Sequence, residues 1–248
     1  MTPLHAVVVL ATGAAAGAMN SVVGSGTLIT FPTLLALGYP AVVANVSNTV
    51  GLVPGSLLGA YGYRSHLVGQ RPLIGRLALF AALGGLLGGG LLLMLPASVF
   101  RAAVPVLIGA ACVLVAVQPY LSRRLAHRRQ AGQHAGAALF LGVFCIAVYG
   151  GYFGGGQGVL LLGLMGVLLA EPLQRINGIK NILALTANLI AAVLFVAVSH
   201  VSWPVAGLIA LGSGVGGHLG ARFGRRLSPT ALRGIIIAVG VVSVVRLA

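Results

Sequence analysis

Four apolar runs of the chain, at 77–95, 102–117, 182–198 and 234–245, approach or reach the roughly 20 residues that a helix needs to cross a bilayer. Only 6% of the 248 residues are charged, whereas a soluble domain carries about 25%. Because the lipid interior offers the backbone no hydrogen-bond partners, spanning segments must be helices or a closed barrel. A barrel would need short alternating strands, which the sequence lacks. The sequence therefore predicts an all-α polytopic membrane protein.

The charged residues are almost all basic, with a formal net charge of +14 and Glu171 as the only acid. In a soluble protein such a charge would suggest nucleic acid. Here the bases lie mostly between apolar runs, as Arg123, Arg124, Arg128 and Arg129 do. This pattern is typical of cytoplasmic loops and of contact with anionic lipids in the bilayer. We therefore expect no nucleic-acid partner.

Residues with metal-ligand spacing are absent from the sequence. The two cysteines, Cys112 and Cys145, are isolated within apolar runs and form no CxxC pair. No cluster of histidine, cysteine and acidic residues has the spacing of a zinc site. We therefore expect neither a metal site nor a cofactor.

The chain is duplicated, since a shift of 132 residues superimposes its two halves without a gap. The matched pairs include Gly24 with Gly156, Gly26 with Gly158, Pro40 with Pro172, Asn45 with Asn177, and Gly84-Gly85 with Gly216-Gly217. We predict a first transmembrane repeat at 1–116, a basic cytoplasmic linker at 117–132 and a second repeat at 133–248, together forming one transport domain. Such internal symmetry is common in transporter folds.

Each repeat is expected to hold a glycine-broken helix or re-entrant pair followed by long transmembrane helices. The expected segments are 4–22, 27–38, 41–63, 73–95 and 98–118, then 134–153, 159–170, 173–198, 203–222 and 229–247. Segments 27–38 and 159–170 are short, and the sequence leaves open whether they cross in series or are re-entrant. Loop 64–72 is basic and its counterpart 199–204 has no Lys or Arg. Equivalent loops should therefore face opposite sides, which predicts inverted repeats with both termini outside.

Inverted repeats place the substrate site near the bilayer midplane and build it from broken helices. The candidate substrate-binding residues come from the two glycine breaks and from the polar helix starts after the matched prolines. They are Asn20, Gly24, Ser25, Gly26, Asn45, Asn48, Gly154, Gly155, Gly156, Gln157, Asn177, Lys180 and Asn181. Hydrogen-bond donors dominate this set and carboxylates are absent. Because amides at a helix N-terminus attract oxyanions, a small anion is the favoured ligand.

Several of these residues also have structural explanations. Lys180 could reach a membrane interface or pair with Glu171. Asn45 and Asn177 could make hydrogen bonds between helices. The glycines at 84–90 and 212–220 are expected to allow close helix packing rather than to bind a ligand.

Three classes of function fit a polytopic membrane protein with a central polar site. A secondary transporter with alternating access is the leading hypothesis. An anion channel, or an importer of another small anion, is the alternative. An intramembrane enzyme using Ser25 with His200 or His218 is remote, because the equivalent of Ser25 is Gln157 and no orienting acid accompanies these residues.

Both glycine breaks, the Pro–Asn spacing after them and the run Asn177-Gly-Ile-Lys180-Asn181 resemble the TauE/SafE family of sulfite and organosulfonate exporters. The resemblance covers essentially the whole chain, although Gly24-Ser25-Gly26 is less glycine-rich than the usual first motif. It implies export of a small sulfur-containing oxyanion, such as sulfite or an organosulfonate. The membrane crossed would be the bacterial cell membrane, that is, the inner membrane. No enzymatic activity is expected, and a homodimer is compatible with the sequence.

Overall fold

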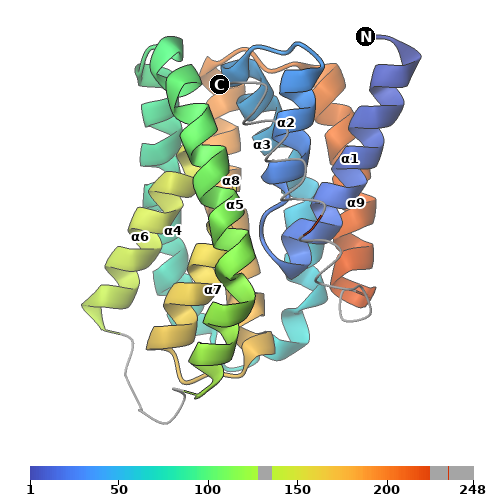
Figure 1. The fold of residues 1–248 in the computed structure, drawn as a ribbon. Coiled ribbons are helices and arrows are strands. Elements are labelled where there is room, and N and C mark those ends of the chain that lie inside the picture. Colours follow the sequence, from blue (N-terminus) through green and yellow to red (C-terminus); the bar gives the residue numbers. More distant parts are fainter. Residues whose placement is uncertain (128–135, 224–233, 235–248) are drawn as a thin grey trace.

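The computed structural model describes residues 1–127, 136–223 and 234, without the side chains of 118–119, 121–127 and 223. These residues form helices and no strand, which confirms the all-α prediction (Figure 1). The α-helices are α1 (Pro3–Val22), α2 (Thr27–Ala36), α3 (Ala41–Gly62), α4 (Arg71–Met94), α5 (Ala97–His127), α6 (Ala137–Tyr152), α7 (Gln157–Leu168), α8 (Leu173–Val198) and α9 (Trp203–Phe223), with a 3₁₀-helix η1 (Arg64–Leu67) before α4.

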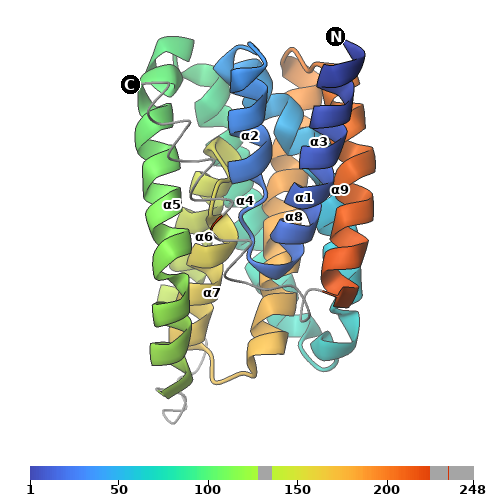
Figure 2. The same ribbon diagram turned by 45° about the vertical axis from the view of Figure 1, so that its right-hand side comes forward.

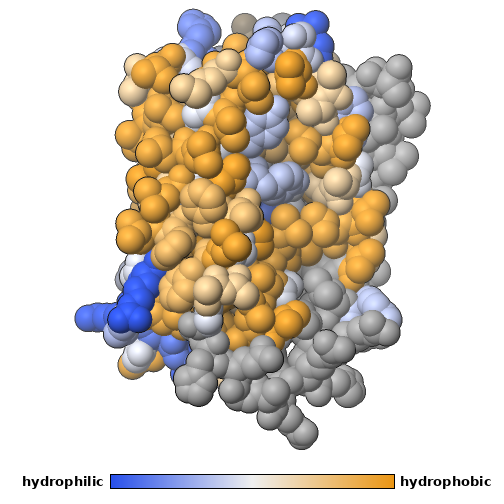
Figure 3. All heavy atoms as spheres, turned by 90° about the vertical axis from the view of Figure 1, so that its left-hand side faces the viewer, coloured by the Kyte–Doolittle hydropathy of each residue, from blue (hydrophilic) through white to orange (hydrophobic). Residues whose placement is uncertain are grey.

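Six of these helices, α1, α3, α4, α5, α8 and α9, are long and apolar enough to cross a membrane. One face of the molecule carries a broad band of hydrophobic atoms, with hydrophilic atoms gathered toward the two ends (Figure 3). The protein is therefore a multi-pass membrane protein, as the sequence predicts. The helix expected at 229–247 lies outside the described residues.

The two short apolar segments form re-entrant pairs with the helices that precede them. α1 runs inward from one end of the molecule and α2 returns to that end, whereas α6 and α7 enter and leave at the opposite end (Figures 1 and 2). Left-handed glycines end the inward helices, Gly24 with φ 85° after α1 and Gly154 with φ 82° after α6. The question that the sequence left open is thus answered in favour of re-entrant pairs. An inverted relation of the complete repeats stays a prediction.

The helices form two bundles, and each bundle contains one helix that belongs to the other half of the chain. α9 packs along α1 and α3, and α4 packs along α6 and α8. One bundle therefore contains α1, α2, α3 and α9, and the other contains α4, α6, α7 and α8. The two bundles meet where α3 contacts α8, while α5 packs mainly against α7. The sequence repeats do not indicate this exchange of helices.

Glycines allow the exchanged helices to approach their new neighbours. A Cβ on Gly85 in α4 would lie 2.5 Å from the carbonyl oxygen of Ala187 in α8. A Cβ on Gly217 in α9 would lie less than 3.0 Å from the carbonyl oxygen of Gly55 in α3. Both pairs are related by the shift of 132 residues, so the same backbone crossing occurs twice. The prediction that the glycines at 84–90 and 212–220 serve close packing is confirmed for most of them, whereas a Cβ on Gly90 would meet no atom within 4 Å.

Basic side chains gather at one end of the molecule. Arg64 and Arg71 lie around the α3–α4 loop, and Arg222 lies at the end of α9. The α8–α9 loop, which carries no Lys or Arg, lies at the opposite end together with the N-terminus (Figure 1). By the positive-inside rule, we expect the end with the α3–α4 loop to face the cytoplasm.

Candidate functional site

The tips of the two re-entrant pairs touch each other inside the molecule. The Gly158 amide donates to the Gly24 carbonyl oxygen over 3.0 Å. A Cβ on either glycine would lie less than 3.0 Å from the Cα of the other, so the two backbones are in direct contact. The two predicted glycine breaks, far apart in the sequence, therefore form one site.

Side chains of the opposite half cover the carbonyl ends of α1 and α6 at this site. The Lys180 ammonium donates to the carbonyl oxygens of Asn20 (3.3 Å) and Ser21 (3.4 Å) at the end of α1. Asn181 Nδ2 donates to the same Ser21 oxygen over 3.2 Å. In the other half, Asn45 Nδ2 donates to the carbonyl oxygen of Tyr152 at the end of α6 over 3.0 Å. The partial negative charge of both helix ends is thereby compensated.

The amide ends of α2 and α7 at the same site remain open. The residues that precede these helices, Gly26 and Gly156, provide no side-chain cap. Among the described residues, the amides of Ser25, Gly26, Thr27, Gly155 and Gly156 have no acceptor. Unsatisfied amides at a helix start carry positive potential and bind anions. With the carbonyl ends covered and the amide ends open, the site favours a negative ligand.

Buried side-chain atoms without a partner add to this incomplete set of hydrogen bonds. Within the described part of the chain, Ser25 Oγ, Asn45 Oδ1 and Asn177 Oδ1 have no hydrogen-bond partner. Ser25 and Asn45 are completely buried and Asn177 is 8% exposed. Buried polar atoms are normally satisfied. The Ser25 hydroxyl can donate to an anion, whereas the two amide oxygens only accept and are suited to bound water or to a donor group of a ligand.

Lys180 is completely buried, so its side chain does not reach a membrane interface, which was one of its two structural explanations. Pairing with Glu171 is also wrong, because the Glu171 carboxylate accepts from Gln70 Nε2 over 2.8 Å and from Arg175 over 2.7 Å. Within the described residues, only backbone carbonyls face the Lys180 ammonium. A buried cation without an anionic partner is costly unless a ligand or a proton exchange relieves it.

Other candidates hold helices together instead of offering free polar atoms. Asn48 Nδ2 donates to Thr27 Oγ1 over 3.3 Å, and its carbonyl oxygen accepts from the Thr30 hydroxyl. These bonds connect α3 to α2. Asn20 Nδ2 donates to Ser56 Oγ over 2.8 Å and so connects α1 to α3. The structure thus assigns Asn48 and the Asn20 side chain to positioning the break between α1 and α2.

Gln157 begins α7 and is buried against its own re-entrant pair. Its side chain is 2% exposed, and a Cβ on Gly150 would overlap with it. Gly150 lies in α6, so Gln157 fills the space between the two arms of this pair. A larger residue at position 150 would therefore require the end of the Gln157 side chain to move.

Tyr149 is a positioning residue that the sequence analysis missed. Its hydroxyl donates to the Gly155 carbonyl oxygen over 2.5 Å, which holds the second break in place. Phe31 and Phe153 pack edge to face beside it, with ring centroids 5.5 Å apart. The residue equivalent to Tyr149 in the first half is Gly17, so the repeat contained no signal for this role.

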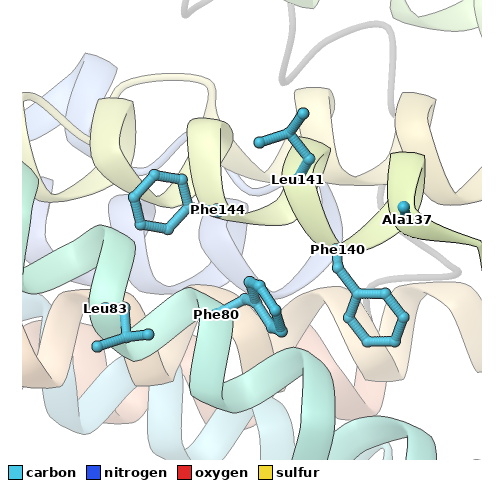
Figure 4. Close-up of a pocket in the computed structure, with 6 residues that line it drawn as sticks. All are labelled: Phe80, Leu83, Ala137, Phe140, Leu141 and Phe144. Carbon is cyan, nitrogen blue, oxygen red and sulfur yellow. The ribbon is translucent and has the colours of Figure 1, made fainter.

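An apolar pocket of about 430 Å³ lies elsewhere, between α4 and α6 (Figure 4). Its lining residues are Phe80, Leu83, Ala137, Phe140, Leu141 and Phe144. None of these side chains is polar, so the pocket does not fit an anion. Among the described residues, no cluster of three metal-ligating side chains occurs either.

Comparisons with known proteins agree over nearly the whole chain. A family model described as Sulfite exporter TauE/SafE matches residues 9–247. A probable membrane transporter protein of Haemophilus influenzae is 26% identical over 93% of this chain and 89% of its own length. The probable membrane transporter protein ORF9 of a Sinorhizobium species is 27% identical over 94% of this chain and 88% of its own length. The probable membrane transporter protein YfcA of Escherichia coli K12 is 28% identical over 92% of this chain and 82% of its own length. No solved structure matches.

Proposed function

The chain is a membrane transporter that belongs to the TauE/SafE family, and we propose that it exports a small sulfur-containing oxyanion such as sulfite or an organosulfonate. The observation that carries this proposal is the set of open amides at the starts of α2 and α7, where the two glycine breaks touch. Sulfur oxyanions present several acceptor oxygens on one atom, which fits donors that converge from two helices.

Lys180 supplies the full positive charge of the proposed site. In the absence of ligand its ammonium is held by the carbonyl end of α1, which carries about half a negative charge. An oxyanion at the neighbouring amides would offer a stronger partner, because hydrogen bonds between charged groups exceed those to neutral carbonyls. Binding would therefore draw Lys180 away from α1 and loosen the link between the halves.

Movement of the two bundles would give the anion access to each side in turn. At the cytoplasmic end, Gln70 and Arg175 both bind Glu171, and Arg175 Nε donates to the His66 carbonyl oxygen over 3.2 Å. These contacts connect the α3–α4 loop to the start of α8 and would have to open for entry from the cytoplasm. Their counterpart at the other end is formed by Ser47 and Ser202.

At the outer end, the Ser202 amide donates to Ser47 Oγ over 2.9 Å and holds the α8–α9 loop against α3. With both contacts formed and the central polar residues buried, release would require this second contact to open. Alternating access follows if the two contacts open one at a time. Outward movement of one negative charge gains about 2.3 kcal/mol per 100 mV of inside-negative potential, so the membrane potential alone could drive export.

Thermal stability of the purified protein tests the substrate class directly. The ligands to compare are sulfite, thiosulfate, sulfate, sulfoacetate and chloride, each added to wild type, Lys180→Ala and Lys180→Met. A ligand that binds only the folded state raises stability by about 2.7 kcal/mol at one hundred times its dissociation constant. We expect a clear shift with a sulfur oxyanion in wild type and none in either Lys180 variant.

Arg101→Ala is the matched control, because Arg101 is exposed near the outer end of α5. It should retain the wild-type ligand shift. Equal shifts in Lys180→Met and wild type would remove Lys180 from the site, and absence of any shift in folded wild type would reject the sulfur oxyanion. Saturable counter-transport in proteoliposomes separates a transporter from a channel, which would instead show single-channel currents.

A further inference from the structure

A second pocket, of about 600 Å³, opens at the cytoplasmic end beside the α3–α4 loop. Two arginines and several apolar side chains line it together, namely Arg64, Arg71, Leu67, Val68, Ile74 and Ile182. It is formed by η1, the start of α4 and the exposed flank of α8. The pocket lies away from the glycine breaks and is not part of the proposed transport site.

The positive charge of this pocket has no acidic partner in the protein. Glu171 is the only acidic side chain of the chain, and both of its oxygens are engaged by Gln70 and Arg175. Arg64 is nevertheless oriented, since its guanidinium carbon lies 3.9 Å from the centroid of the Tyr61 ring and Nη1 donates to the Tyr61 carbonyl oxygen over 3.1 Å. The pocket therefore holds two cations, one of them ordered, for which an anion must come from outside.

The start of α4 adds to the same positive field. This helix is 24 residues long and begins at Arg71 without a side-chain cap on its amides. Its N-terminal dipole attracts an anion at the end of the helix where Arg71 lies. The cationic part of the pocket therefore combines two guanidinium groups with the amide end of a long helix.

The remainder of the pocket is apolar and exposed at the surface of the molecule. Val68 is 77% exposed, and Ile74 and Ile182 are only half-buried on α4 and α8. A soluble anion would gain nothing from such a wall. A phospholipid has the two required parts, a phosphate for the arginines and an acyl chain for the apolar side.

We propose that this pocket is a binding site for one anionic phospholipid of the cytoplasmic leaflet. The headgroup phosphate lies between Arg64 and Arg71, and the adjoining acyl chain passes along Ile74 and Ile182. An anionic headgroup is required because a zwitterionic one carries its own cation and leaves the two arginine charges partly uncompensated. The site belongs to the cytoplasmic end that the positive-inside rule assigns.

Native mass spectrometry of the detergent-purified protein tests the site, with dioleoylphosphatidylglycerol, dioleoylphosphatidylcholine and inorganic phosphate as probes. Each basic residue near an anionic lipid contributes about fivefold in affinity, so Arg64→Gln with Arg71→Gln should weaken binding of the first phosphatidylglycerol about 25-fold. The charge-matched control, Arg76→Gln with Arg101→Gln, changes two exposed arginines that do not line the pocket and should bind as wild type does.

A second variant fills the apolar side without changing any charge. Gly75 lines the pocket, and a Cβ there meets no atom within 4 Å, so Gly75→Leu should fold normally and still exclude the acyl chain. Its matched control is Gly207→Leu, the equivalent helical position of the second half, which is also open and lies outside the pocket. Gly75→Leu should lose the bound lipid and Gly207→Leu should keep it.

Three results would overturn the proposal. Equal binding of phosphatidylcholine and phosphatidylglycerol would show that the arginines do not select the headgroup. Competition by inorganic phosphate as strong as by the lipid would make the pocket a soluble-anion site. Unchanged lipid binding in Gly75→Leu, or an equal loss in both double arginine variants, would place the lipid elsewhere.

Discussion

The contact between the two glycine breaks can be tested with three alanine substitutions that differ in one feature at a time. Gly24 has a φ of 85° and faces Gly158, so Gly24→Ala introduces both backbone strain and a steric overlap. Gly38 has almost the same φ, 86°, but meets no atom within 4 Å, so Gly38→Ala introduces the strain alone. Gly158 has no positive φ, so Gly158→Ala introduces the overlap alone.

The magnitudes follow from these geometries. A left-handed conformation costs a non-glycine residue about 1–2 kcal/mol, which is the expected loss for Gly38→Ala. At Gly24 the new Cβ lies less than 3.0 Å from Gly158 Cα, whereas ordinary contact begins at 3.4 Å, so the two tips must separate by more than 0.4 Å. Overpacking of this kind costs about 1–3 kcal/mol. Gly24→Ala should therefore destabilise the protein by about 2–5 kcal/mol.

Equilibrium unfolding in mixed micelles measures these differences, and the double variant provides the decisive comparison. Once one Cβ has separated the tips, the second costs less, so Gly24→Ala with Gly158→Ala should fall short of additivity by about 1 kcal/mol or more. A Gly24→Ala variant that is no less stable than Gly38→Ala would refute the direct contact. So would strict additivity of Gly24→Ala and Gly158→Ala.

Three further substitutions test other parts of the structure. Lys180→Met keeps the volume of the side chain and removes its charge, so it should abolish anion binding while a cooperative thermal unfolding transition is retained. Glu171→Gln keeps the contact with Gln70 but weakens the one with Arg175. Because the Glu171–Arg175 pair is partly exposed, the loss of stability should stay below about 1 kcal/mol and become smaller in high salt. Unfolding measured at two ionic strengths checks both expectations. Gly88→Ala, which overlaps with the α6 backbone, should cost about 1–3 kcal/mol, whereas Gly90→Ala, which meets no atom within 4 Å, should be neutral or stabilising in the same assay.

The sequence by itself determined the local properties of this protein. The apolar runs predicted the membrane helices, and glycines 24 and 154–156 marked where α1 and α6 end, because left-handed backbone is a property of single residues. The duplication placed matching polar residues in both halves, and the absence of acids beyond Glu171 favoured an anion. These features depend on composition and on neighbours along the chain.

Only the tertiary structure shows which side chains of one repeat cover the helix ends of the other repeat. Asn45 covers the end of α6, 107 residues away, and Lys180 covers the end of α1, 160 residues away. Tyr149 supports Gly155 with no equivalent in the first half. Helices in lipid are apolar on every side, so hydrophobic periodicity does not tell which face meets which neighbour. That choice depends on backbone contacts at glycines and on single hydrogen bonds, which become visible only once the helices are packed together.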